Sequence, residues 1–314
     1  MRVQHPRRLL AKDSIFLIAP GFAFQKKLLL SGKKFLEKKF HIKAHYLKSI
    51  HEKFSYFAGD DERRTQELLR ALTSDKNKAV FAVRGGYGCS RIYPELIYNL
   101  KKQKKNLKPK ILLGYSDLTI LLNALFQDLG WVTFHGPVVA SRIFETPLPI
   151  EAKTLYQCLF LDEPLGRVST RSMKVLTQGT AEGRIVGGCL SLLVTSIGTP
   201  YEIQTKNRIL FIEEVAEKPY RIDRMLTQLL HAGKLKDVKG VVFGHMTNCG
   251  STKEILSAIM LSIGNALAAQ NIPILYGFPS GHGRPHITFP IGVQVLLNAK
   301  KQNPFIEFLE SGVS

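Results

Sequence analysis

The 314-residue sequence contains few cysteines and no long apolar segment. Its four cysteines, at positions 89, 158, 189 and 249, form no CxxC pair, which excludes zinc-ribbon and dithiol redox motifs. Four thiols are also too few for a disulfide scaffold, so a reducing compartment is expected. No stretch approaches the roughly 18 apolar residues of a membrane-spanning helix. Because 45% of the residues are hydrophobic and 22% are charged, disorder is excluded as the main state.

Acidic residues are scarce, with 25 Asp and Glu against 44 Lys and Arg and a net charge of +19. Residues 1–54 hold 13 basic residues against 3 acidic ones, and residues 101–110 hold six lysines. Such an excess can mark a nucleic-acid or anionic-surface partner. No aromatic residues interleave the segment 101–110 and no nucleic-acid motif is present. We therefore interpret the lysines as a solvated face and expect neither a nucleic-acid nor a membrane partner.

The N-terminal region has some features of a signal peptide, because Arg7 and Arg8 precede the apolar run 14–24. Pro20 and Gly21 interrupt this run, and two lysines follow it almost at once. We therefore predict a buried strand over 14–19 that ends in a glycine loop, and a cytoplasmic location.

At roughly 150 residues per domain, the length predicts two domains. In the first half, short apolar strands alternate with helices, which is typical of a parallel sheet covered on both faces. The strands expected there are 14–19, 79–83, 111–115 and 131–136, and the helices are 26–40, 61–72 and 117–130.

From about residue 145 the chain gains Pro, Gly and polar residues, and the pattern beyond them is α+β. The expected helices are 187–198, 219–233 and 252–270, and the expected strands are 208–215, 238–246, 287–299 and 304–310. The predicted organisation is an α/β domain at 1–150, a linker at 151–178 and a smaller α+β domain at 179–314.

Ser116 has the sequence context of a nucleophile. It lies between an apolar strand and a helix, where a sharp turn lifts a side chain above the carboxyl edge of a parallel sheet. The first N–H groups of the helix point to the same place and can stabilise an oxyanion. The sequence GYSD lacks the second glycine of G-x-S-x-G. A helix N-cap role for Ser116 or Asp117 is the alternative.

The loop RGGYG (84–88) follows the preceding strand, and its paired glycines allow close backbone approach to a ligand or simply a tight turn. A serine nucleophile needs a base, and the base needs an orienting group. His282 is a candidate base because it lies in a Gly- and Pro-rich loop, where packing does not require a polar ring. Other histidines considered are His45, His51, His135 and His245.

The strand 208–215 offers two candidates for the orienting group. Glu213 and Glu214 are consecutive, so they face opposite sides of the strand and one must face the core or cleft. A carboxylate there needs a partner. The alternative is an ion pair with Arg221 or Arg224 on the following helix.

Six segments, in this order, resemble the murein tetrapeptide LD-carboxypeptidases, a serine peptidase family that also contains the microcin C self-immunity peptidases. They are RGGYGCSRI, GYSDLTILLNAL, FHGPV, GGCLSLLVTSIGTPYE, LFIEEVAEKPYRIDRMLTQL and GFPSGHGRPHITFPIGV. The resemblance covers roughly residues 14–300. It implies a flavodoxin-like N-terminal domain, a swivelling β/β/α C-terminal domain and a homodimer.

The resemblance also implies a catalytic triad of Ser116, Glu213 and His282 at the domain interface. The oxyanion hole would come from the backbone N–H groups of Gly86 and Asp117. No metal or cofactor is expected.

Three charged residues lie near the motifs and are candidates for binding substrate charges: Arg84, Glu217 and Arg221. The sequence departs from the family pattern at Cys189, which replaces the Asn of GGN, and at His286, where an Asn is expected after GH. If these positions touch substrate, specificity differs.

The implied reaction removes the terminal D-Ala from the muropeptide L-Ala-γ-D-Glu-meso-diaminopimelate-D-Ala during peptidoglycan recycling. The stretch EEVAEKPYRIDR fits the murein branch better than the microcin branch. Two alternatives stay open: a microcin-immunity-like peptidase that acts on a peptidyl-nucleotide, and a non-catalytic basic protein that binds anions.

Overall fold

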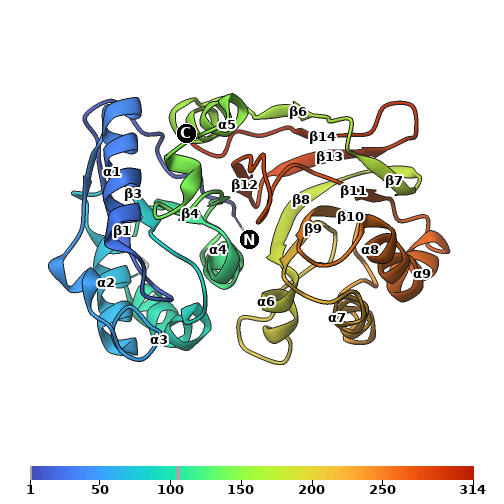
Figure 1. Cartoon of the computed structure of the whole chain (residues 1–314), viewed down its shortest axis with the longest axis horizontal. Coiled ribbons are helices and arrows are strands. Elements are labelled where there is room, and N and C mark those ends of the chain that lie inside the picture. Colours follow the sequence, from blue (N-terminus) through green and yellow to red (C-terminus); the bar gives the residue numbers. More distant parts are fainter. Residues whose placement is uncertain (1, 104–106) are drawn as a thin grey trace. The chain divides into compact units, whose positions relative to one another are not determined.

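The computed structural model describes residues 2–103 and 107–314, so residues 104–106 of the lysine-rich segment lie outside the described residues. The chain forms two compact units (Figure 1). The first comprises Met1–Glu163, Thr288–Pro290 and Gly312–Ser314, and the second comprises Pro164–Ile287 and Ile291–Ser311. Within the described ranges, no helix is both long and apolar enough to cross a membrane.

The first unit is built on a largely parallel sheet. Its strands are β1 (Ser14–Ile18), β2 (Lys43–His45), β3 (Ala79–Ala82), β4 (Ile111–Gly114), β5 (Thr133–His135) and β12 (Phe289–Ile291). They lie in the order β12-β5-β4-β3-β1-β2, and β2, β1, β3, β4 and β5 pair in parallel. This 2-1-3-4-5 order is the flavodoxin-like arrangement, in which ligands bind at the carboxyl ends of the strands. The expected fold of the N-terminal part is confirmed.

Helices follow most of these strands. They are α1 (Lys26–Phe40), α2 (Asp61–Thr73), α3 (Cys89–Lys102), α4 (Thr119–Leu129) and α5 (Pro149–Phe160), with short 3-10 turns η1 (Lys48–His51), η3 (Ser116–Leu118) and η4 (Arg142–Phe144). Helix α2 begins where the Asp60 side chain accepts a hydrogen bond from the Arg63 N–H at 2.8 Å. Helices α2, α3 and α4 pack side by side. The connection from β1 through α1 to β2 runs along the sheet in the opposite direction from the later connections. Because such crossovers are right-handed, α1 lies on the opposite face of the sheet from α2, α3 and α4.

The second unit contains a mixed sheet. Its strands are β6 (Gly166–Val168), β7 (Lys174–Thr177), β8 (Gly179–Cys189), β9 (Arg208–Val215), β10 (Gly240–Thr247), β11 (Ile274–Tyr276), β13 (Gln294–Ala299) and β14 (Phe305–Phe308). Their order is β6-β14-β13-β8-β9-β10-β11-β7. The central strands β8 to β11 are parallel, and the flanking pairs are antiparallel.

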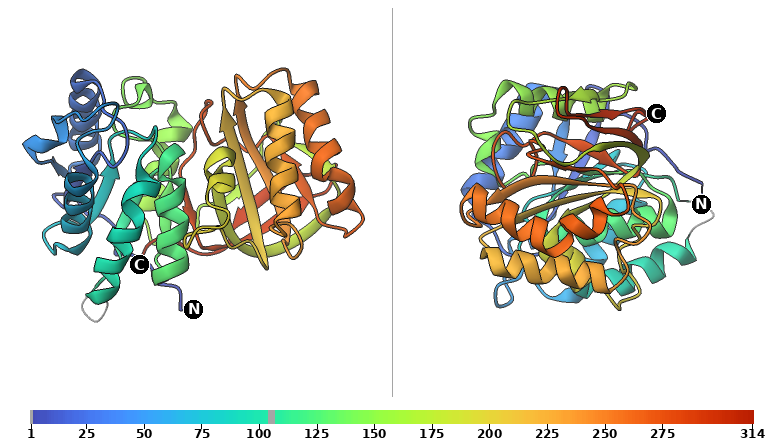
Figure 2. Two further views of the ribbon diagram at one scale, coloured as in Figure 1. Left: turned by 90° about the horizontal axis from the view of Figure 1, so that it is seen from below. Right: turned by 90° about the vertical axis from the view of Figure 1, so that its right-hand side faces the viewer.

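Helices cover one face of this second sheet, as Figures 1 and 2 show. They are α6 (Leu190–Thr195), α7 (Pro219–His231), α8 (Thr252–Ile259) and α9 (Asn265–Ala268), and a π-helical turn η5 (Met260–Gly264) joins the last two. The strand predicted at 208–215 is confirmed as β9, and the α+β character of this half is confirmed.

Three predicted elements differ from the structure. The segment 187–198 is not one helix, because pairing with β9 continues through Cys189 and only α6 is helical. The segment 287–299 divides between the two sheets, as β12 and β13. The segment 151–178, expected to be a linker, contains most of α5 and the strands β6 and β7. The proposed domain boundaries themselves stay a prediction.

Candidate active site

Ser116 lies in a strained turn at the carboxyl end of β4. The strand ends at Gly114, Ser116 begins the turn η3, and α4 follows at Thr119. The backbone of Ser116 has φ +64°, in the left-handed region that a non-glycine residue occupies at a cost of about 1–2 kcal/mol. A residue held in such a conformation between a strand and a helix has the geometry of a nucleophile elbow.

Asp117 connects this turn to the glycine loop after β3. Its side chain is fully buried, and Oδ2 accepts a hydrogen bond from the backbone N–H of Cys89 at 3.0 Å. Cys89 is the first residue of α3, so the carboxylate satisfies one of the free N–H groups at that helix end. Burial raises the pKa of Asp117, while the hydrogen bonds from Cys89 and the charge of Arg64 oppose that rise. The side chain of Asp117 therefore fixes the loop that follows β3 relative to the Ser116 turn.

The glycine loop approaches Ser116 closely at Gly85. A Cβ built on Gly85 would lie 2.9 Å from Ser116 Cβ and 3.1 Å from its Oγ, so a larger residue would displace the hydroxyl. Gly86, the predicted oxyanion donor, is exposed and has φ +101°. The oxyanion roles of Gly86 and Asp117 stay predictions.

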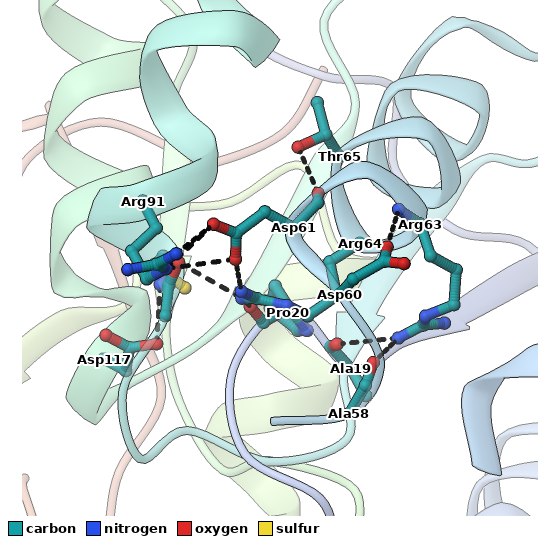
Figure 3. A network of polar contacts seen from close by, with 12 residues as sticks. Ala19, Pro20, Ala58, Asp60, Asp61, Arg63, Arg64, Thr65, Arg91 and Asp117 are labelled. Atoms are coloured by element: carbon teal, nitrogen blue, oxygen red, sulfur yellow. Dashed lines mark hydrogen bonds and ion pairs between the residues drawn. The ribbon is translucent and has the colours of Figure 1, made fainter. Parts of the chain in front are cut away.

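Arg64 is a structural residue that the sequence analysis missed (Figure 3). Its side chain is fully buried, and it donates hydrogen bonds to the carbonyl oxygens of Pro20 and Gly88 and pairs with Asp61. Pro20 follows β1 and Gly88 precedes α3, so one guanidinium joins the loops after β1 and β3. Arg64 stands four residues before Leu68 on the buried face of α2, and that spacing was the available signal.

Glu213 and His282 form a close pair in the second unit. His282 Nδ1 lies 2.7 Å from Glu213 Oε2, and the His282 backbone N–H donates to the same oxygen at 3.2 Å. The Glu213 side chain is fully buried and that of His282 is 15% exposed. A Cβ on Gly281, which has φ +118°, would lie 2.7 Å from Glu213 Oε2, so glycine is required for the loop to close on this carboxylate.

This pairing changes the proton affinity of the imidazole. Burial lowers the pKa of His282, but the hydrogen bond to Glu213 and the charges of Glu213 and Glu214 outweigh it, and the net pKa is raised above 6.5. The carboxylate also fixes which ring nitrogen bears the proton, because Nδ1–H must donate to Oε2. The second nitrogen, Nε2, is then the atom suited to accept a proton.

Glu214 points to the other side of β9 and makes different contacts. Its carboxylate accepts hydrogen bonds from the N–H groups of Ser191 at 2.7 Å and Val215 at 2.8 Å. Burial raises its pKa, although these two bonds oppose the rise. Arg221, one of the two arginines of the alternative ion pair to α7, instead pairs with Glu217 at 3.3 Å. The two glutamates contact His282 and the backbone N–H groups of Ser191 and Val215.

The remaining candidates lie in varied surroundings. Arg84 is exposed and donates to the carbonyl oxygen of Ala23 at 2.6 Å. Cys189 is buried beside Glu214, with Sγ 3.4 Å from Oε1, and burial raises the pKa of its thiol. His286 is fully buried. Substrate contacts of these residues, and of Glu217 and Arg221, stay predictions.

The other histidines have other partners. His135 is fully buried and stacks on Phe289, and His245 lies 2.9 Å from the carbonyl oxygen of Pro285. His45 and His51 are exposed. Across the part of the chain that the structure describes, no group of three or more His, Cys, Asp or Glu side chains is arranged to hold a metal ion.

Comparison with known proteins identifies relatives along nearly the whole chain. The LD-carboxypeptidase N-terminal domain matches residues 15–136, and the LD-carboxypeptidase C-terminal domain matches residues 182–297. The "Probable murein peptide carboxypeptidase" of Bacillus subtilis is 35% identical over 98% of this chain and 95% of its own. The murein tetrapeptide carboxypeptidase of Pseudomonas aeruginosa is 30% identical over 91% of this chain and 94% of its own. The crystal structure of an MccF-like protein from Bacillus anthracis superposes with a TM-score of 0.88, at 27% identity, and covers 97% of this chain and 99% of that one.

Proposed function

Because the chain belongs to the LD-carboxypeptidase family of serine-type peptidases, we propose that it removes the terminal D-Ala from a murein tetrapeptide. The bond cut is the amide between diaminopimelate and D-Ala. The buried Glu213–His282 pair, with its 2.7 Å contact, is the observation that carries this proposal. Relatives named for murein peptides support the choice of substrate.

We assign the chemical steps as follows. The Ser116 hydroxyl oxygen attacks the carbonyl carbon that precedes D-Ala, while His282 Nε2 accepts the hydroxyl proton. Glu213 stabilises the imidazolium that forms. The backbone N–H groups of Gly86 and Asp117 stabilise the oxyanion, a contribution of about 3–4 kcal/mol per donor in comparable sites.

The protonated His282 then donates its proton to the leaving amine of D-Ala, and the acyl-enzyme forms on Ser116. Water, activated by the neutral imidazole, hydrolyses this ester and releases the shortened peptide. The strain at Ser116 supports this assignment, because it presents the hydroxyl beside the glycine loop.

A second substrate class is a peptidyl-nucleotide, because the similar structure from Bacillus anthracis is MccF-like. The same residues would cleave an amide in either substrate, so only the occupant of the binding site differs. The proposal also includes a cytoplasmic role in peptidoglycan recycling and a homodimer. Cell fractionation and light scattering of the purified protein test these two points.

Mass spectrometry of a tetrapeptide digest tests the proposed reaction. We expect the mass of the peptide to fall by one D-Ala residue, and we expect Ser116→Ala to reduce turnover by about six orders of magnitude. Cleavage of a peptidyl-nucleotide but not of the tetrapeptide would reassign the substrate. Activity of a few per cent or more in Ser116→Ala would overturn the assigned nucleophile. Steeply salt-dependent polyanion binding, without peptidase activity, would favour the anion-binding alternative.

A further inference from the structure

A cavity of about 620 Å³ lies in the second unit, next to the loop that carries His282. It is formed by the carboxyl ends of β10 and β11, the start of β7 and residues 284–285 of the loop. Volumes of 300–1,000 Å³ are typical of small-molecule sites, and open α/β sheets bind ligands at this edge of their strands.

The lining of this cavity is suited to an anion. Lys174, His245 and Arg284 contribute to it, whereas no Asp or Glu is present among its described lining residues. Five lining residues carry hydroxyl groups that can donate hydrogen bonds: Thr170, Ser172, Thr247, Thr252 and Tyr276. The cations Lys174 and Arg284, together with neutral donors and no acid among the described lining residues, form a carboxylate-binding environment.

The cavity and the proposed catalytic base share one loop. His245 Nε2 lies 2.9 Å from the carbonyl oxygen of Pro285, and a Cβ on Gly283 would lie 2.6 Å from the Cγ of the same ring. Residues 283–285 therefore rest on His245, which lines the cavity. His282 is two residues from Arg284, which also lines it. A ligand in the cavity thus contacts the segment that positions His282.

We propose that this cavity binds a carboxylate of the substrate peptide on the side that precedes the scissile bond. This inference rests on the proposed function. Only one small residue follows the scissile bond, so a cavity of this size suits the larger preceding part. A murein tetrapeptide has two side carboxylates there, one left free by the γ-linkage of D-Glu and one on diaminopimelate.

Substitution of Lys174 tests the inference through the split between KM and kcat. Lys174 is exposed and pairs with Tyr276 across β7 and β11, so Lys174→Met removes the charge without opening the core. We expect KM for the tetrapeptide to rise about tenfold, as for loss of one charge-assisted hydrogen bond, while kcat changes less than about twofold. Arg284→Met is a second variant with the same expected direction. Arg171→Met is the matched control, because Arg171 is exposed nearby but does not line the cavity.

Two modified substrates identify the carboxylate. One has D-isoglutamine in place of D-Glu, and the other has L-Lys in place of diaminopimelate. If the cavity holds a carboxylate, Lys174→Met loses its effect on KM with one of them and keeps it with the other. An equal effect with all three substrates, or an equal effect of Arg171→Met, would show that the inference is wrong. Failure of the wild-type protein to release D-Ala from any of them would instead overturn the proposed function.

Discussion

Replacement of Glu213 by Gln removes the charge beside His282 and leaves the side-chain volume nearly unchanged. In the wild-type protein, the carboxylate contacts Nδ1 at 2.7 Å and the His282 backbone N–H at 3.2 Å. Both contacts are made to Oε2, so the carbonyl oxygen of a glutamine can accept both hydrogen bonds, but it carries no charge to stabilise the imidazolium. The variant therefore measures the contribution of the Glu213 charge separately from that of its size and shape.

The expected fall in kcat/KM follows from the distance between His282 and Glu213. A 2.7 Å contact between nitrogen and oxygen puts the two charge centres about 4 Å apart, where unit charges interact by about 4 kcal/mol at an effective dielectric constant of 20. Solvent screening is weak, because the side chains of His282 and Glu213 are 15% and 0% exposed. At about 1.4 kcal/mol per power of ten, we expect kcat/KM to fall about a thousandfold.

The pH profile supplies an independent readout. His282 must be neutral to accept a proton, so the acid limb of kcat/KM follows its raised pKa. In Glu213→Gln burial still lowers that pKa and only the weaker opposition from Glu214 remains, so the limb moves to lower pH. The free energy of unfolding depends on pH for the same reason. The raised pKa of His282 stabilises the folded wild-type protein below pH 6.5, and this stabilisation is lost as the pH rises through the folded-state pKa. The destabilisation caused by Glu213→Gln is therefore largest at acid pH.

Release of D-Ala from the tetrapeptide, measured across pH 5 to 9, gives both quantities. Glu214→Gln is the matched control, because Glu214 bonds to backbone N–H groups and does not touch His282. We expect it to shift the acid limb less than Glu213→Gln does and to lower kcat/KM by less than tenfold. Two results would show that Glu213 does not orient the base. In one, Glu213→Gln lowers kcat/KM less than tenfold and the acid limb of its pH profile does not move. In the other, the two variants have equal mild effects on kcat/KM.

Three further predictions follow from the first unit. Ser116→Gly and Ser116→Ala are both expected to be inactive, but the glycine variant should be about 1 kcal/mol more stable because φ is +64°; equal unfolding temperatures would contradict the strain. Gly85→Ala should lower kcat at least tenfold while the protein stays folded by circular dichroism, because the added Cβ lies 3.1 Å from Ser116 Oγ; unchanged kcat would show that the loop yields. Arg64→Met should destabilise the protein in urea unfolding by about 1–3 kcal/mol for each of the Pro20 and Gly88 carbonyl groups that loses its buried donor, whereas Arg70→Met on the exposed face of α2 should cost below about 0.5 kcal/mol; equal costs would argue against the role of Arg64.

Local patterns were sufficient to predict most elements of the first unit. Buried parallel strands are short apolar runs, and helices such as α2 have one apolar face, so both can be recognised within a few residues. Helix α3 was not predicted, and Pro94 lies inside it, where a proline usually argues against a helix. The division of the segment 287–299 into β12 and β13 was not predicted either. The local alternation of apolar and polar residues indicates a strand but does not indicate which sheet the strand joins.

Local patterns were likewise insufficient to predict the contacts within the candidate site. The strand pattern alone indicated Glu213 or Glu214 without choosing between them, since both belong to one apolar strand, and only the family resemblance singled out Glu213. The choice rests on a contact with His282, which is 69 residues away in the chain. The buried Arg64 was not predicted, because a basic residue on an amphipathic helix is usually exposed. Its carbonyl partners lie in two loops, and hydrophobic periodicity does not predict which loops come close together.

Strand β12 and residues Gly312–Ser314 complete the first unit, although they follow most of the second in the chain. Ser314 exchanges hydrogen bonds with the backbone of Pro6 and Arg8, and β12 covers the edge of β5. The first sheet therefore has an open edge at β5 until β12 has paired with it. A fragment that stops at residue 163 would keep that edge exposed, which favours aggregation. The first unit is therefore complete only when the last residues of the chain have joined it.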